Sequence, residues 1–252
     1  LAGPFSWYEA HLCSEEGWNI IGGTFPGGAT IFHGVNENLG WAHTVSFADY
    51  SDVYKLEMHP DKKLTYKFDG KWLKLEERKV KMKVKFWIFK KKKTKKYYLS
   101  VYGPTLKVKK DFYSMRILAN MNIKAAEQWY KMNKAKNLSE FKDALRFQGV
   151  TGLNFIYADK EKNIFYTDNG LFPERNSDYD WWGVLPGNTS KTLWKPVFLP
   201  FDSMLKIENP KCGYVFNSNN TPFVATAESE NIDPNSINKN LKYFRYMTNR
   251  GH

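Results

Sequence analysis

The sequence has almost no cysteine, since only Cys13 and Cys212 occur in 252 residues. Two cysteines so far apart match no zinc-binding spacing and no disulfide-rich scaffold, which leaves one long-range disulfide or two buried thiols as alternatives. Apolar runs long enough to cross a bilayer are also missing, and the first residues from Leu1 onward do not have the charged-then-apolar pattern of a leader. We therefore predict no transmembrane segment.

The usual catalytic patterns are missing as well. No Gly-x-Ser-x-Gly elbow occurs, and the five histidines are spaced neither as a metal pair nor as a zinc finger. His43, beside Trp41 and Thr44, is the first choice if a histidine is catalytic. A hydrogen-bonded histidine in a strand is the stronger interpretation of this position.

Hydrophobic residues make up 42% of the chain and aromatic residues 17%, which is enough for a sizeable core. The net charge of +12 is concentrated between Lys79 and Lys96. Alternation at period two there predicts a strand with one wet face, and Lys90 to Lys96 is predicted to be an exposed hairpin tip. Because nucleic-acid surfaces usually spread their charge over a whole face, we expect a solvated hairpin and no nucleic-acid partner.

The pattern of turns and apolar residues predicts an α+β fold. Residues 1–115 read as strands, with a hairpin turn at Asp69-Gly70, and residues 150–252 as strands and long ordered loops. Between them, within residues 120–148, helical spacing covers Ile123 to Asn133 and Leu138 to Phe147. Asn137 or Ser139 is expected to cap the second helix. The prediction is thus antiparallel sheets with a helical hairpin insertion.

Three polar clusters are candidates for chemistry. Gly34 to Asp52 carries a tryptophan, a histidine, hydroxyls and acids where a strand meets a loop. Asn217 to Asn220 contains three asparagines, whose amides suit an oxyanion but which also serve ordinary turns. Asp49 and Asp52 provide carboxylates for a hard cation, or they belong to a solvated turn.

These segments resemble, in order and over essentially the whole chain, the penicillin acylase family of N-terminal nucleophile hydrolases, which includes acyl-homoserine lactone acylases. The motifs that carry the resemblance are Phe25-Pro26-Gly27, Gly34 to Val45, Tyr102-Gly103-Pro104, Gln128-Trp129-Tyr130, Phe147-Gln148-Gly149, Tyr157-Ala158-Asp159, Gly170 to Arg175, and Asn217 to Asn220.

The resemblance implies a four-layer αββα fold, present here in part. It also implies an exported amidohydrolase, periplasmic or extracellular, that acts on a small-molecule N-acyl amide. In the family a precursor cuts itself into a small (alpha) and a large (beta) subunit, and the N-terminal serine of the large subunit is the nucleophile. That serine would lie upstream of Leu1, so this chain is expected to be inactive alone. The alternative is a non-catalytic member or a binding module that keeps the fold.

The resemblance also implies the roles of single residues. The oxyanion hole would combine the backbone N–H of Val45 with the amide of Asn219, supported by Arg250 or, as the weaker candidate, Arg245. An apolar acyl pocket would be lined by Phe25, Ala29 and Ile31. One calcium ion would bind Asp49, the carbonyl of Ser51 and Asp52, with a further acid from Glu230, Asp233 or the small subunit. No organic cofactor is expected.

Overall fold

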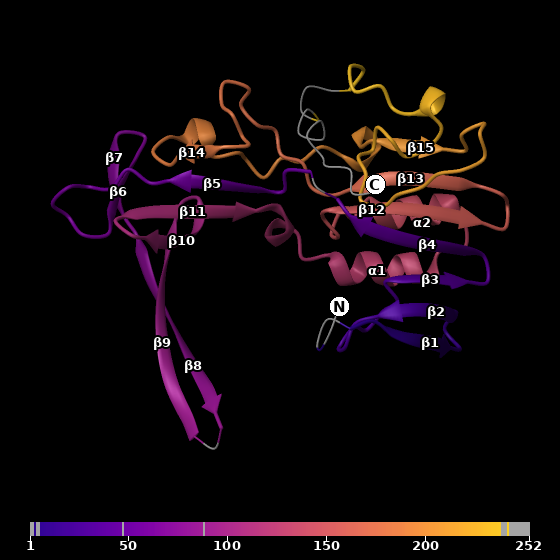
Figure 1. The fold of residues 1–252 in the computed structure, drawn as a ribbon, viewed down its shortest axis with the longest axis horizontal. Coiled ribbons are helices and arrows are strands. Elements are labelled where there is room, and N and C mark those ends of the chain that lie inside the picture. Colours follow the sequence, from indigo (N-terminus) through magenta and orange to yellow (C-terminus); the bar gives the residue numbers. More distant parts are fainter. Residues whose placement is uncertain (1–2, 4–5, 47, 88, 238–240, 242–252) are drawn as a thin grey trace. The chain divides into compact units, whose positions relative to one another are not determined.

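The protein is described by a computed structural model, which covers the chain except residues 1–2, 4–5, 47, 88, 238–240 and 242–252 (Figure 1). The chain divides into two compact units. The first unit comprises residues 1–50, 118–173 and 198–252, and the second comprises residues 51–117 and 174–197. The strand-rich first 115 residues therefore contribute to both units.

The first unit contains a seven-stranded antiparallel sheet in the order β1-β2-β3-β4-β12-β13-β15. The strands are β1 (Tyr8–Ser14), β2 (Trp18–Thr24), β3 (His33–Asn36), β4 (Leu39–Val45), β12 (Leu153–Asp159), β13 (Ile164–Asn169) and β15 (Lys206–Glu208), and the helices are α1 (Ala125–Lys134) and α2 (Leu138–Leu145). Because β4 pairs with β12 over its whole length, the end of β4 is held at the centre of the sheet.

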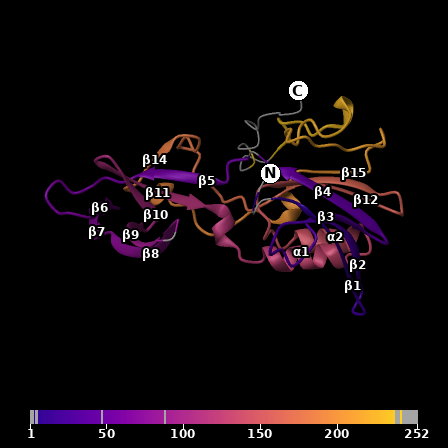
Figure 2. The ribbon, with the colours of Figure 1, turned by 60° about the horizontal axis from the view of Figure 1, so that its bottom comes forward.

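Helices α1 and α2 lie along this sheet, as Figure 2 shows. Trp129 and Met132 on α1 and Phe141 on α2 enter one core cluster with residues of the strands. Trp129 and Met132 are three residues apart, as are Leu138 and Phe141, which places each pair on one face of its helix. Asn137 caps α2, since its side-chain oxygen accepts a hydrogen bond from the backbone N–H of Glu140 at 2.9 Å. The predicted helical hairpin and its Asn137 cap are confirmed.

The second unit contains a six-stranded sheet in the order β14-β5-β11-β10-β9-β8, in which only the β14–β5 pair is parallel, and a separate β6–β7 hairpin. Its strands are β5 (Ser51–Lys55), β6 (Thr65–Phe68), β7 (Lys71–Lys74), β8 (Glu76–Phe86), β9 (Phe89–Ser100), β10 (Gly103–Val108), β11 (Asp111–Ile117) and β14 (Val184–Pro186). Buried aromatic rings fill its interior, with Tyr54 stacked on Tyr102 at 4.2 Å between ring centroids.

The turn at Asp69-Gly70 forms as predicted, because both residues have positive φ angles, 45° and 76°. This is the left-handed backbone that a two-residue hairpin turn requires, and glycine adopts it without steric cost. The prediction for Lys90 to Lys96 is wrong. These residues belong to strand β9, which starts at Phe89 and pairs with β8 from Phe86 back to Glu76.

Several smaller features complete the description. Within the described residues, neither helix is long and apolar enough to cross a bilayer. Cys13 and Cys212 are both free, exposed thiols, so they form neither the disulfide nor the pair of buried thiols that the sequence left as alternatives. Between Gly170 and Pro222 the structure has loops with the short strands β14 and β15 and the short 3-10 turns η3 (Ser190–Thr192) and η4 (Phe201–Ser203), as the density of proline, glycine and asparagine predicts.

Candidate functional site

The structure brings Val45 and Asn219 together, although they are 174 residues apart in sequence. Val45 is the last residue of β4 and is 54% exposed. The side-chain Nδ2 of Asn219 donates a hydrogen bond to the Val45 carbonyl oxygen at 2.9 Å. An amide has two N–H donors, and this bond uses one of them. Among the described residues the other N–H of this amide has no hydrogen-bond acceptor.

The three asparagines of the Asn217–Asn220 turn do different things. The Asn217 side chain accepts a hydrogen bond from the backbone N–H of Asn219 at 2.9 Å and donates to the Asn220 carbonyl at 3.1 Å. The Asn220 side chain accepts from the Ser218 N–H at 2.6 Å. These two asparagines therefore shape the turn. Asn219, held in the left-handed region at φ 67°, projects its amide to β4.

A buried hydrogen-bond chain supports this junction from the sheet. Asn154, fully buried on β12, donates to the Thr44 hydroxyl at 3.2 Å and accepts from the Tyr166 hydroxyl at 2.8 Å. The Thr44 hydroxyl in turn donates to the Asn217 side chain. Polar groups buried in this way are satisfied by one another, which fixes their geometry. These hydrogen bonds thus connect β4, β12 and β13 to the Asn217–Asn220 turn.

The buried carboxylate of Asp168 lies next to this hydrogen-bond network, and no local sequence signal marks it. Asp168 on β13 is fully buried and accepts hydrogen bonds from the Ser46 hydroxyl at 2.6 Å and the Tyr50 hydroxyl at 2.7 Å. Burial raises the pKa of Asp168 to about 7, although the two hydroxyl donors oppose this shift. Ser46 follows Val45 directly, so Asp168 anchors the backbone on the far side of the candidate oxyanion site.

His43 belongs to the scaffold of the first unit. Its ring lies 3.7 Å from that of His33 and packs against Trp129 and Phe155. Burial, with a smaller contribution from His33, lowers the pKa of His43 to about 3. A histidine with so low a pKa is neutral at physiological pH and is a weak base. This agrees with the interpretation of His43 as a strand histidine.

The three residues predicted to line an acyl pocket have different surroundings. Phe25 is partly exposed and stacks on Trp7 at 3.9 Å between ring centroids. Ala29 is exposed. Ile31 is fully buried in the core, and both its backbone groups bond to the Asn133 side chain, at 2.9 and 2.8 Å. Only Phe25 and Ala29 therefore present surface that a ligand can touch.

The residues predicted to bind calcium belong to different units: Asp49 is in the first unit, and Ser51 and Asp52 are in the second. Asp52 is buried, and its two oxygens accept hydrogen bonds from the guanidinium of Arg175 at 3.1 and 3.0 Å. Oδ2 also accepts from the Trp194 indole at 2.6 Å. Because a cation already neutralises this carboxylate, Asp52 as it stands does not fit a calcium ligand.

The other residues predicted to bind calcium are Glu230 and Asp233, and those predicted to support the oxyanion hole are Arg250 and Arg245. Glu230 accepts hydrogen bonds from the backbone N–H groups of Lys211 and Cys212, at 2.6 and 2.7 Å, and Asp233 is exposed. Among the residues that the structure describes, no group of three or more His, Cys, Asp or Glu is arranged to hold a metal. Arg250 and Arg245 lie outside the described residues.

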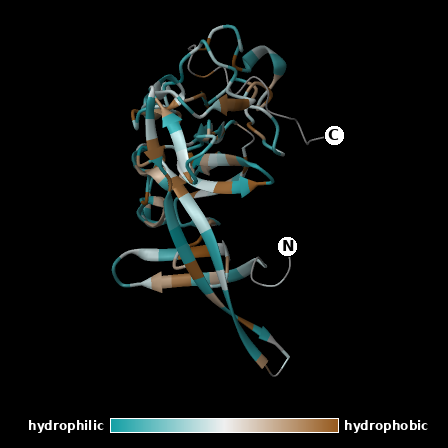
Figure 3. Cartoon of the chain, turned by 90° about the vertical axis from the view of Figure 1, so that its left-hand side faces the viewer, coloured by the Kyte–Doolittle hydropathy of each residue, from teal (hydrophilic) through white to brown (hydrophobic). Residues whose placement is uncertain are grey.

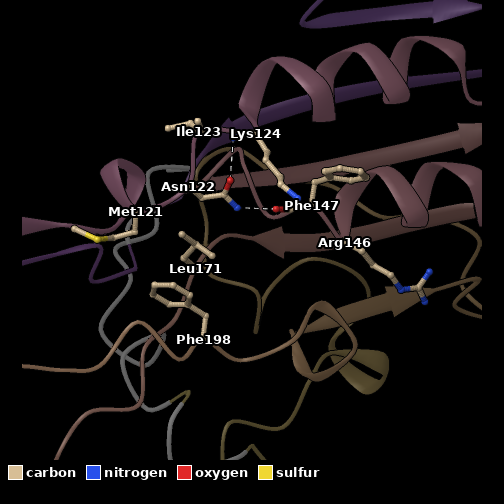
Figure 4. A pocket seen from close by; sticks show the side chains of 8 residues that line it. All are labelled: Met121, Asn122, Ile123, Lys124, Arg146, Phe147, Leu171 and Phe198. Carbon is tan, nitrogen blue, oxygen red and sulfur yellow. Dashed lines mark hydrogen bonds between the residues drawn. The ribbon is translucent and has the colours of Figure 1, made fainter.

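A cavity of about 530 Å³ lies in the first unit, where α1 begins and α2 ends (Figure 4). Asn122 spans its wall, because its side chain donates to the Phe147 carbonyl at 2.8 Å and accepts from the Lys124 N–H at 2.9 Å. The rim includes Ile123, which is 97% exposed. Neither Val45 nor Asn219 lines this cavity, so it is separate from the candidate oxyanion site.

Comparison with known proteins identifies the fold and the family. The structure matches that of a thermostable penicillin G acylase from Alcaligenes faecalis with a TM-score of 0.78 and 24% identity, over 90% of this chain and 41% of that chain. The fold is therefore that of the N-terminal nucleophile hydrolases, an α+β class with antiparallel sheets, as predicted. The sequence profile of the penicillin amidase family matches residues 1–249, and the chain belongs to that family.

Two curated relatives show how much of a family member the chain represents. Penicillin G acylase from Escherichia coli is 30% identical over 233 residues, which is 87% of this chain and 26% of the relative. The acyl-homoserine lactone acylase PvdQ from Pseudomonas syringae pv. syringae (strain B728a) is 27% identical over 180 residues, 68% of this chain and 23% of the relative. The chain thus spans about a quarter of the length of these relatives.

Proposed function

We propose that the protein to which this chain belongs is an amidohydrolase that cleaves a linear N-acyl amide, and that this chain supplies its oxyanion hole. The nucleophile is an N-terminal serine upstream of Leu1, whose own α-amino group accepts the hydroxyl proton. The family membership and the names of the relatives support this proposal. The observation that carries it is the contact of Asn219 Nδ2 with the Val45 carbonyl at 2.9 Å.

The chemistry requires donors where negative charge develops. When the serine oxygen attacks the amide carbon, the carbonyl oxygen becomes an oxyanion, and fixed N–H donors lower its energy without reorganising. In the proposal these donors are the Val45 backbone N–H and the second N–H of the Asn219 amide. The buried chain through Thr44 and Asn154 keeps them in place. Arg250 remains the predicted support for the amine.

We also propose that the substrate has an apolar acyl group and that a small subunit is the partner of this chain. The stacked pair Trp7 and Phe25, with Ala29, supports an apolar acyl group as the part of the substrate that this chain binds. The partner is a small subunit cut from the same precursor. Exposed Ile123 and the exposed Tyr8 of edge strand β1 are apolar surface for such a partner to cover. An exported protein, periplasmic or extracellular, is proposed from the family alone.

The test uses the complete reading frame, processed and purified, with chromogenic phenylacetyl and long-chain fatty acyl amides. Asn219→Ala should lower kcat by about 10²- to 10³-fold with little change in KM, because one transition-state donor is lost. Asn219→Asp, which keeps the size but not the donors, should lose as much. Asn235→Ala, at an exposed asparagine in the same unit, is the matched control. A kcat within twofold of the wild type for Asn219→Ala would overturn the oxyanion assignment.

The isolated chain gives a second test. Without the upstream serine it should hydrolyse neither amide above the buffer rate. Hydrolysis by this chain that disappears in Asn219→Ala would contradict the assignment of the nucleophile. The alternative function, a non-catalytic module that keeps the fold, predicts an alanine or glycine at the position of the nucleophile. Mass spectrometry of the processed N-terminus decides between the two.

A further inference from the structure

Strands β8 and β9 form a two-stranded arm, defined here as residues 79–96, which no other strand of the second unit pairs with (Figure 1). The register puts lysine directly opposite lysine at three places on one face. These pairs are Lys79–Lys96, Lys83–Lys92 and Lys85–Lys90. Directly opposed like charges destabilise an antiparallel pair. Repulsion between these opposed lysines therefore destabilises the pairing of β8 with β9.

Little in the chain neutralises this charge. The two strands contain eleven basic and two acidic residues, a surplus of nine out of the net twelve of the whole chain. Both acids are at the base of the hairpin, where Glu77 pairs with Lys96 at 3.1 Å. From residue 78 to residue 110 the sequence contains no aspartate or glutamate. The distal lysines are exposed, and among the described residues the acid that forms ion pairs with lysines of the arm is Glu77 at its base, which leaves the distal lysines accessible to an anionic partner.

The opposite face of the arm carries both aliphatic side chains and lysines. On it Val80, Met82 and Val84 of β8 lie opposite Lys95, Lys93 and Lys91 of β9, and the two valines are more than 40% exposed. Figure 3 shows hydrophilic and hydrophobic stretches alternating along the arm. At the end of the arm Trp87 is 81% exposed and Phe89 is 67% exposed. The arm thus combines an aromatic end and an aliphatic stripe along β8 with lysines on both faces, all accessible to a ligand.

We propose that this arm binds the surface of an anionic lipid bilayer. Tryptophan and phenylalanine at the end would enter the interface between headgroups and acyl chains, and the lysines would extend their aliphatic stems along it and reach the anionic headgroups. Single-stranded nucleic acid would also bind lysines through its phosphates and aromatic rings through its stacked bases. It makes no specific contact with aliphatic side chains such as Val80 and Val84. The aliphatic stripe therefore favours lipid. This inference does not rest on the amide chemistry of the first unit.

The experiment measures sedimentation of the chain with sucrose-loaded vesicles of phosphatidylcholine, with and without one quarter phosphatidylglycerol. We expect binding only to the anionic vesicles, and its release as salt rises from about 0.1 to about 0.5 M. Lys83→Gln/Lys92→Gln should weaken the partition coefficient about 25-fold, at about fivefold per lysine. Trp87→Ser should weaken it about tenfold, and Trp87→Phe should leave it nearly unchanged.

The matched control is Lys62→Gln/Lys63→Gln, which removes the same charge from an exposed loop of the same unit. It should change the partition coefficient less than threefold. An equal loss in this control, or equal binding to neutral vesicles, would overturn the proposal. So would tight retention on single-stranded DNA without binding to anionic vesicles, since it would make the partner a nucleic acid. Because all the substituted side chains are exposed, circular dichroism should report an unchanged fold.

Discussion

Polar side chains near the end of β4 are buried, whereas those of the β8–β9 arm are exposed. Around β4, Asn154 and Asp168 are fully buried, and each bonds to side chains of other segments. In the arm the lysines are exposed, and lysine faces lysine across the strands. Buried polar groups must find partners within the chain, whereas exposed charges need none. The comparison teaches that the first region is arranged for fixed geometry and the second for contact with a partner.

The largest effect should come from a buried charge deprived of its partner. Arg175→Met leaves the Asp52 carboxylate, which is 1% exposed, without its guanidinium, and we expect the free energy of unfolding to fall by about 3–5 kcal/mol. Asp52→Asn combined with Arg175→Met should recover a good part of this. Urea unfolding measures both. A loss below about 1 kcal/mol in the single variant would show that the interior of the second unit tolerates unpaired charge.

A neutral buried network should show a somewhat smaller cost. The Asn133 side chain bonds to both the N–H and the carbonyl of Ile31, at 2.9 and 2.8 Å. Asn133→Ala leaves two buried backbone groups unsatisfied, and we expect a loss of about 3 kcal/mol in urea unfolding. Asn137→Ala, which removes only a helix cap, should lose about 1 kcal/mol. Equal losses in the two variants would show that burial of the Asn133 hydrogen bonds does not increase their contribution to the free energy of unfolding.

The carboxyl group of Asp168 should make stability depend on pH. Because burial raises its pKa to about 7, the folded chain binds a proton that the unfolded chain has released between about pH 4 and 7. Its stabilising contribution is complete below that range and is lost as pH rises through about 7. Asp168→Asn removes this dependence, so its stability relative to the wild type should improve by about 2–3 kcal/mol from pH 5 to pH 8.

Urea unfolding at several pH values measures this change, and Asp233→Asn, at an exposed aspartate, is the control. A constant difference between wild type and Asp168→Asn across the range would show that Asp168 titrates normally. It would also mean that the carboxyl group of Asp168, on β13, is no more desolvated than the exposed charges of the arm.

The smallest effect should come from the arm itself. Lys92→Glu turns the opposed pair with Lys83 into one of opposite charge, and we expect a gain of about 0.5 kcal/mol in thermal or urea unfolding. Lys95→Glu, opposite Val80, changes the same charge without making a pair and should gain less. A loss of stability in Lys92→Glu would mean that the lysine face contributes to folding.

Local signals were predicted well from the sequence. The hairpin turn at Asp69-Gly70 and the cap at Asn137 depend on residues within a few positions, and both form as expected. Lys90 to Lys96 was predicted to be a tip because charge density resembles a loop, but pairing with β8 places it in a strand. Asp168 carried no local signal, since a single acid near the end of an apolar run is ordinary. Val45 and Asn219 came from family motifs, and their catalytic roles stay predictions.

By itself the sequence determined the periodicities, the turns, the surplus of lysine and the membership of a family, because dihedral preferences and composition act over short stretches of chain. Tertiary structure alone decided which polar groups are buried and with whom they pair. Asn219 reaches Val45 across 174 residues, and Ser46 reaches Asp168 across 122. Desolvation and hydrogen bonding depend on such distant neighbours, and no short stretch of sequence contains them.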